Sequence, residues 1–245
     1  IAVYFAGGGL GMLATALSLP LFLEAYGPMA WPLGWMMLGG GSLLLFIPAL
    51  LAARASPPMI KTSTATRPAA LPWLRLLPAF LAYFLFGLGY VIYTTFLVVW
   101  MRGQDADAMM IATTWGVMGV AVMASPFVWR PVLARAQGGA AICLTNLATG
   151  GAVLLPFLVP GNSAILLSAA VFGASFFMVP SAVTTFSRRN LPQASWGRAI
   201  ALFTTIFSIG QIVGPVGAGY VTDLLGRSEP SLIAGGVILL FGAAA

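Results

Sequence analysis

The stretch SLLLFIPALLAA, residues 42–53, carries no charge and does not alternate between apolar and polar residues. It lies in an apolar run of 31–53, long enough to cross a hydrocarbon core about 30 Å thick as a helix. Membrane strands need short alternating segments instead, so we predict an all-α polytopic membrane protein. Similar runs occupy 1–23, 31–53, 76–101, 108–129, 139–158, 163–187, 199–222 and 231 to the end.

The composition also narrows the classes of function. Of 245 residues, 60% are hydrophobic and 7% are charged. There is no His and one Cys, Cys143, which excludes a His-based triad, a His or multi-Cys metal site and a His-ligated haem within this chain. Every acid lies at or outside a predicted helix end, which disfavours a membrane hydrolase with paired carboxylates. We therefore expect neither an enzyme nor a metal or cofactor.

The charged residues predict the orientation in the membrane. Loops 54–75, 130–138 and 188–198 hold nine of the eleven basic residues and no acid, whereas the alternate loops hold all five acids with only Arg102 and Arg227. Because basic loops stay in the cytoplasm, we place those three loops there, in a multi-pass protein of a bacterial inner membrane. The net charge of +6 then reflects topology, and no nucleic acid is expected as a partner.

A weak internal repeat organises the chain. Gly11 precedes Glu24 by thirteen residues and Gly27 follows it by three, and Gly210, Asp223 and Gly226 repeat this spacing. The repeat predicts that 1–53 holds the last two helices of an N-terminal six-helix half, that 54–75 is a mobile cytoplasmic linker, and that 76–245 is the C-terminal half. Both chain ends fall inside apolar runs, so we interpret the chain as a fragment whose last helix is truncated.

Three segments carry a resemblance to a known family. YFAGGGLGMLATALSLP (4–20) and GQIVGPVGAGYVTDLLG (210–226) resemble the fifth and eleventh helices of the major facilitator superfamily. YFLFGLGYVIYTTFLVVWMR (83–102) is similar to the seventh helix of its YbfB/YjiJ-like bacterial branch. The resemblance implies a major-facilitator-type bundle with eight of twelve helices present, and alternating access around a central cavity.

One motif departs from the family pattern. Its cytoplasmic Gly-x-Leu-Ala-Asp-Arg motif is expected within 125–139, but that segment has no Asp. Gly219, Asp223, Gly226 and Arg227 match the motif spacing in a loop that the charges place outside. The charge asymmetry of the loops outweighs this motif match, and the predicted orientation keeps Asp223 and Arg227 outside.

Helical projection separates residues that face a cavity from residues that pack. One polar and aromatic stripe lies on 76–101 and a second polar stripe on 199–222; isolated candidates come from three other helices. The candidates for a substrate cavity are Tyr83, Tyr90, Thr94, Trp115, Asn146, Thr149, Phe176, Thr204, Ser208 and Gln211. For Gln211 and Asn146 an interhelical hydrogen bond is an open alternative, as packing is for Trp115. Ser168 and Ser175 are weaker candidates, since a hydroxyl can bond its own helix backbone.

Glycines and a proline in the runs 1–23 and 199–222 are predicted to serve helix packing and bending. Gly7, Gly11, Gly210, Gly214 and Gly217 are expected to let neighbouring backbones approach, and Pro215 is expected to bend its helix. Glu24 and Asp223 stand at the outer helix ends as either coupling groups or loop charges.

These observations favour a monomeric secondary transporter in the lipid bilayer. It would move a small organic solute by alternating access, with export favoured over uptake by resemblance. Proton coupling is open, because no ionisable group is predicted at mid-membrane. The alternative is a transporter-like subunit that acts as a sensor or assembly partner in a larger membrane complex.

Overall fold

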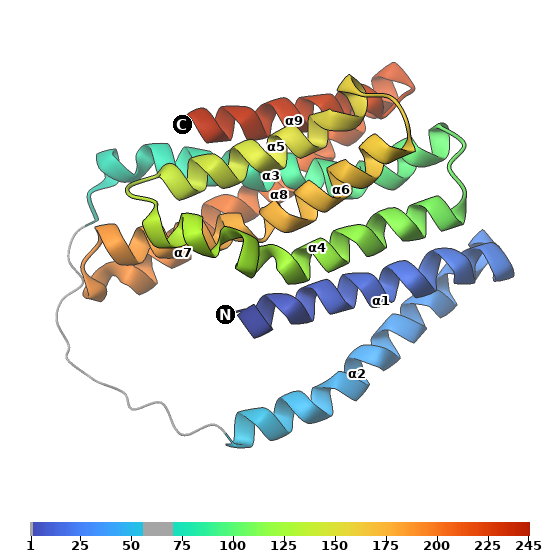
Figure 1. Ribbon diagram of the computed structural model, residues 1–245, viewed down its shortest axis with the longest axis horizontal. Coiled ribbons are helices and arrows are strands. Elements are labelled where there is room, and N and C mark those ends of the chain that lie inside the picture. The colour runs from blue at the N-terminus through green and yellow to red at the C-terminus, as the bar shows by residue number, and fades with distance from the viewer. Residues whose placement is uncertain (1, 56–70) are drawn as a thin grey trace.

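The computed structural model describes residues 2–55 and 71–245, with the side chains of 2–6 left out of the description. Most of the predicted mobile linker therefore lies outside the described residues. The helices are α1 (Ala2–Tyr26), α2 (Trp31–Ala55), α3 (Trp73–Gly103), α4 (Ala108–Arg135), α5 (Ala140–Leu158), α6 (Asn162–Phe176), α7 (Met178–Asn190), α8 (Trp196–Leu225) and α9 (Glu229–Ala244), with 3-10 turns η1 (Pro28–Ala30) and η2 (Gln193–Ser195) (Figure 1).

The all-α prediction is confirmed, since the described residues contain no strand. Within them, seven helical segments are long and apolar enough to cross a membrane, and α9 is a shorter apolar helix. Each predicted apolar run lies in one of these helical segments, so the spans follow directly from hydropathy.

The run 163–187 was expected to be one helix, but it is divided into α6 and α7 at Phe177. Pro180 explains the break, because it has no N–H to donate to the carbonyl of Phe176 four residues earlier. The two pieces still form a single apolar span, Asn162–Asn190. By contrast, α8 is continuous through Pro215, and the bend expected there stays a prediction.

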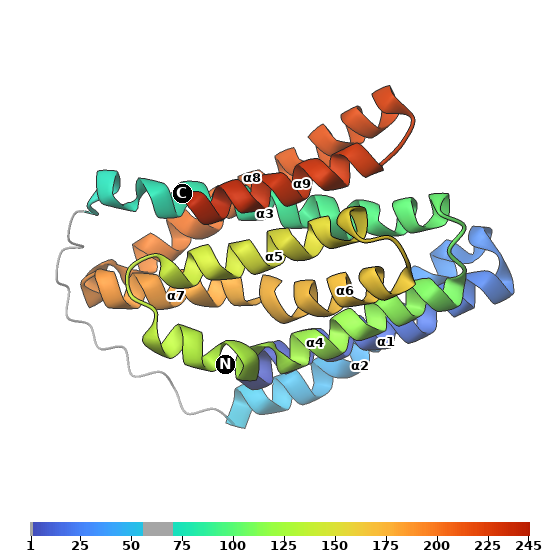
Figure 2. The ribbon, with the colours of Figure 1, turned by 45° about the horizontal axis from the view of Figure 1, so that its top comes forward.

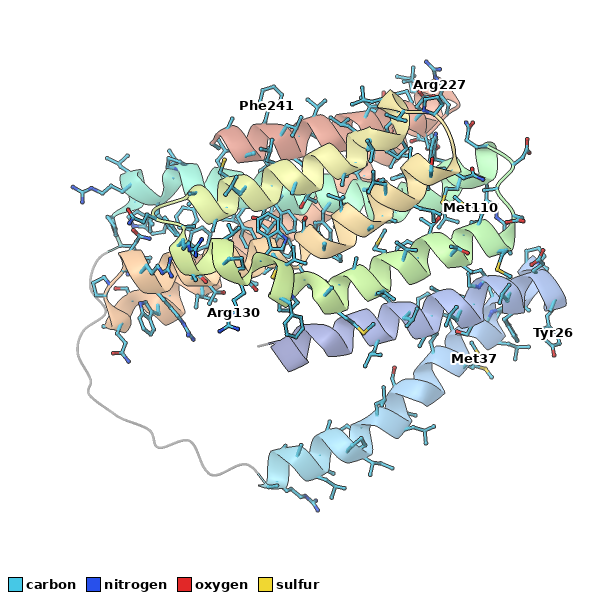
Figure 3. All side chains as sticks on the ribbon, viewed as in Figure 1. Tyr26, Met37, Met110, Arg130, Arg227 and Phe241 are labelled. Carbon is cyan, nitrogen blue, oxygen red and sulfur yellow. The ribbon has the colours of Figure 1, made fainter. Side chains whose placement is uncertain are left out.

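Consecutive spans run in opposite directions, with α6 and α7 counted as one span, so the connecting segments gather at two ends (Figures 1 and 2). One end holds the start of α3 and the connections at 136–139 and 191–195, and the other holds the turns at 27–30, 104–107 and 226–228. In Figure 3, Arg227 lies at the end that holds the turn 226–228, and Arg130 lies in the half of the molecule toward the opposite end. The described parts of the three segments predicted to be cytoplasmic thus share one end, and the turns next to the acids share the other.

The core lies among α3 to α9, whereas α1 packs along α4 and α2 lies outermost (Figure 2). At the basic end, Arg189 of α7 donates hydrogen bonds to the carbonyl oxygens of Ala136 at 2.6 Å and Ala134 at 3.1 Å. This side chain ties α7 to the last turn of α4, where unpaired carbonyls attract a cation.

Two of the three glycines predicted on α8 bring it close to α3. A Cβ atom built on Gly210 would lie 2.5 Å from the carbonyl oxygen of Phe84, and one on Gly214 would lie 2.5 Å from that of Leu88. A Cβ on Gly217 would meet nothing within 4 Å. The close contact is therefore confined to two successive turns of α8.

In α1 the close contact is made by Gly9, in place of the expected Gly7 and Gly11. A Cβ on Gly9 would lie 2.6 Å from the Gly119 carbonyl oxygen of α4, whereas one on Gly7 or Gly11 would meet nothing within 4 Å. A shift of two residues turns a helical side chain by roughly 160–200°, so a side chain at Gly7 or Gly11 would not point into the α1–α4 contact that Gly9 makes.

The turns after α1 and α8, which the spacing of the proposed repeat aligns with each other, share a backbone feature. Gly27 has φ 82° and Gly226 has φ 68°, in the left-handed region that favours glycine at a helix end. Each is followed within a few residues by the next helix, α2 or α9.

Candidate functional site

An aromatic cluster fills the space among α3, α6 and α8. Its rings project from successive turns, so that α3 and α8 interleave along their contact. Within the cluster, the ring centroids of Tyr83 and Phe207 are 4.8 Å apart, and those of Phe86 and Tyr90 are 4.9 Å apart. Tyr90 also stacks on Phe207 at 5.8 Å and on Phe176 of α6 at 5.9 Å. Three of the sequence-predicted residues, Tyr83, Tyr90 and Phe176, are thus brought together.

Gln211 of α8 reaches this cluster. Its Nε2 donates a hydrogen bond to the Tyr90 hydroxyl at 2.5 Å, and both side chains are half-buried. The interhelical bond that the sequence left open is therefore present. The Gln211 amide and the Tyr90 phenol form a polar, hydrogen-bonded pair next to the stacked rings of the cluster.

The hydroxyl candidates nearby bond their own helices. Thr94 donates to the carbonyl oxygen of Val91 at 3.2 Å, Thr204 to that of Ile200 at 2.8 Å and Ser208 to that of Thr204 at 2.9 Å. Such bonds satisfy a hydroxyl without a partner from another helix. The structure therefore gives these three side chains no interhelical role.

Asn146 and Thr149 lie in the interior of the bundle, both with 0% exposure. Asn146 donates to the carbonyl oxygen of Ile142 at 3.1 Å, and Thr149 to that of Thr145 at 2.7 Å, so their bonds stay within α5. A Cβ on Gly242 of α9 would lie 3.6 Å from the Oδ1 atom of Asn146. Both residues thus lie on the face of α5 buried by its neighbours.

Ser168 makes hydrogen bonds to other helices, which its position in the sequence did not indicate. Its hydroxyl donates to the Ala152 carbonyl oxygen of α5 at 2.6 Å and lies 2.8 Å from the Tyr93 hydroxyl of α3. It joins three helices, whereas the sequence argument expected a bond within its own helix. Ser175 is also buried, at 2% exposure.

A second feature is an apolar pocket of about 550 Å³ between α1, α3 and α4. Trp115 lies on its wall, as one of the two sequence alternatives expected. Its lining includes Gly11, Met12, Leu19 and Leu23 of α1, Val98 and Arg102 of α3, and Ile111 and Trp115 of α4. The sequence argument missed Arg102 and the α1 residues, because a helical projection assigns faces within one helix and does not show which helices lie side by side.

The pocket and the cluster approach each other along α1. The rings of Phe176 and Phe177 lie 4.4 Å apart, and a Cβ on Gly8 would lie 3.5 Å from the Phe177 ring. Gly11 and Met12, one turn further along α1, already line the pocket. One side of α1 therefore runs from the edge of the aromatic cluster to the apolar pocket.

The cluster also contains residues that no sequence criterion had selected. Phe203 and Phe207 precede Gln211 by eight and four residues, and Phe86 precedes Tyr90 by four, which places each set on one helical face. That spacing is the signal that could have found them. Glu24 and Asp223 are exposed at the ends of α1 and α8, and the buried polar side chains of the described residues are Ser, Thr and Asn alone.

Comparison with known proteins identifies the family of this chain. The family model described as "Uncharacterised MFS-type transporter YbfB" matches residues 1–245. The chain belongs to this family. It is accordingly a multi-pass membrane protein of the major facilitator type with a transporter role and a small-molecule substrate, in a family that is typically non-enzymatic. No curated protein matches the chain.

Proposed function

We propose that this protein is a secondary transporter that moves a small organic solute across a bacterial inner membrane by alternating access. The observation that carries the proposal is the position of the apolar pocket. It lies beside the α1–α4 contact, which is the principal contact between residues 2–55 and 71–245. If residues 2–55 belong to the N-terminal half and residues 71–245 to the C-terminal half, rocking about the contact changes the access to the pocket.

The aromatic cluster is the second part of the proposed solute path, after the apolar pocket. Its stacked rings offer apolar surface, and the Tyr90–Gln211 pair is its polar spot. An amide left without a partner in hydrocarbon costs several kcal/mol, so these two groups hold each other until a polar atom of the solute replaces one of them. This arrangement fits a largely apolar solute with a hydrogen-bonding group.

Flux measurements test the proposal. In proteoliposomes, Tyr90→Phe and Gln211→Ala are expected to reduce the apparent affinity or rate for the transported solute on the order of tenfold, because each leaves a polar partner unpaired. Thr205→Ala is the matched control, since its hydroxyl donates to the carbonyl oxygen of Ala201 on the same helix. Unchanged kinetics in both site variants would remove the pair from the path. Absence of any flux, with a protein that co-purifies stably, would favour the sensor or assembly-partner alternative.

We further propose that the basic end faces the cytoplasm, that export is the favoured direction, and that the transporter acts as a monomer. Orientation is tested with single cysteines in place of Gln137 and Asp105, both exposed and at opposite ends, in a background with Cys143→Ser. In intact cells, an impermeant maleimide is expected to label position 105 and not position 137. Labelling of 137 from outside would reverse the orientation.

A further inference from the structure

Arg102 is the charged residue in the lining of the apolar pocket. It lies in the last turn of α3 and makes no ion pair with any carboxylate of the described residues. The lining as a whole, Arg102 included, offers almost no polar surface to the pocket, and the Arg102 side chain is exposed. A ligand that enters the pocket therefore meets an apolar wall, with one exposed cation at its edge.

The lining residues give the pocket a direction. Leu23, Arg102 and Ile111 lie near the helix ends that share the acidic-turn end of the molecule, whereas Met12 and Trp115 lie deeper. From Met12 to Leu23, α1 rises about 16 Å at 1.5 Å per residue. The pocket is thus elongated along α1, with the cation at its outer end and the indole further inside.

Charge decides what such a pocket accepts. An organic cation would meet Arg102 with no acid in the lining to balance it, and a neutral molecule would gain no charge-assisted contact from the guanidinium. A carboxylate, sulfonate or phosphate ester pairs with the guanidinium through charge-assisted hydrogen bonds, which are stronger where water is partly excluded. The volume of about 550 Å³ lies within the range of small-molecule sites.

We propose that this pocket binds amphipathic organic anions, with the acidic group at Arg102 and the apolar body along α1 against Trp115. The proposal rests on the proposed function, because it names the substrate class of that same pocket. Such anions come either as soluble organic acids or as anionic lipids of the surrounding membrane.

Binding of two matched fluorescent probes tests the proposal, with the protein in nanodiscs of zwitterionic phosphatidylcholine and empty nanodiscs as background. The anionic probe is 1-anilinonaphthalene-8-sulfonate, and the neutral probe is N-phenyl-1-naphthylamine. Arg102→Gln is expected to weaken binding of the anionic probe about tenfold and that of the neutral probe less than twofold, as loss of one charge-assisted contact predicts. Arg227→Gln, which removes the other basic side chain at that end of the molecule, is expected to change neither.

A second variant checks the location. Gly11→Leu is expected to weaken both probes by occupying the pocket, and it is compatible with folding because a Cβ on Gly11 meets nothing within 4 Å. Equal loss of both probes in Arg102→Gln, or equal effects of Arg102→Gln and Arg227→Gln, would overturn the proposal. Displacement of the anionic probe by decanesulfonate supports a soluble source, and displacement by added phosphatidylglycerol supports a lipid source of the same chemistry.

The two proposals fail separately. Solute flux without Arg102-dependent binding of the anionic probe would remove the anion pocket and leave the transporter. Arg102-dependent binding without flux of any organic anion in proteoliposomes would leave the pocket and remove the proposed transport of its ligand.

Discussion

The first two helices have similar compositions but different surroundings. α1 and α2 have 25 residues each, both are apolar, and each contains three successive glycines, Gly7 to Gly9 in α1 and Gly39 to Gly41 in α2. Gly9 lies against the backbone of α4, whereas a Cβ on any of Gly39 to Gly41 would meet nothing within 4 Å. On α2, Leu44 keeps 71% of its surface exposed.

This difference separates two properties that hydropathy alone does not distinguish. Transfer into a bilayer depends on how apolar each residue is, so α1 and α2 are equivalent candidates for spanning it. Helix association within a bilayer depends on close packing of small residues at the point of contact. A glycine triplet therefore predicts packing only where a second helix meets the same face.

The largest expected effect comes from exchanging side chains at the matched positions of the two helices. Gly9→Leu is expected to lower the free energy of unfolding by about 2 kcal/mol or more, because its Cβ would already clash with Gly119 and Met123 of α4. Gly40→Leu on α2 is expected to stay within about 0.5 kcal/mol of the parent protein. Denaturation of both variants in the same detergent measures the difference, and equal losses would show that the α1–α4 contact is not formed as described.

A smaller effect is expected on α8, where the two kinds of glycine occur in one helix. Gly210→Ala is expected to cost about 1–2 kcal/mol, since its Cβ would lie 2.5 Å from the Phe84 carbonyl oxygen and α3 must move away. Gly217→Ala has open space and is the matched control. Thermal denaturation ranks the two variants, and a Gly217→Ala variant as unstable as Gly210→Ala would contradict the two-turn contact.

The smallest effect has the opposite sign. Gly7→Ala adds a methyl group to an open face of α1 and replaces a poor helix former by a good one, so it is expected to raise stability by about 0.5 kcal/mol. Gly9→Ala, two residues away, is expected to lower it. If both variants changed stability in the same direction, the register of α1 on α4 would be different.

The arrangement of the aromatic site was only partly accessible from the sequence. Tyr90 and Gln211 were selected because polar groups in apolar helices need partners, and the structure pairs them with each other. Asn146 met the same criterion, but it lies on a buried face of α5 with its amide bonded to its own helix. The criterion identifies polar groups that need partners without saying which neighbour supplies them.

The sequence alone established the spanning segments and the separation of basic and acidic connections to opposite ends. Both properties follow from the hydropathy and charge of the individual residues, which do not depend on which helices are neighbours. The sequence argument expected 163–187 to be one helix and missed the break at Phe177, because Pro180 removes one donor from the helix but Pro215 leaves α8 continuous. Only the tertiary structure decided that Gly9 and not Gly7 or Gly11 meets α4, and that Arg102 shares a pocket with Trp115. Those relations depend on where helices distant in sequence come together and on the rotation of each about its axis, which the residues of one helix do not specify.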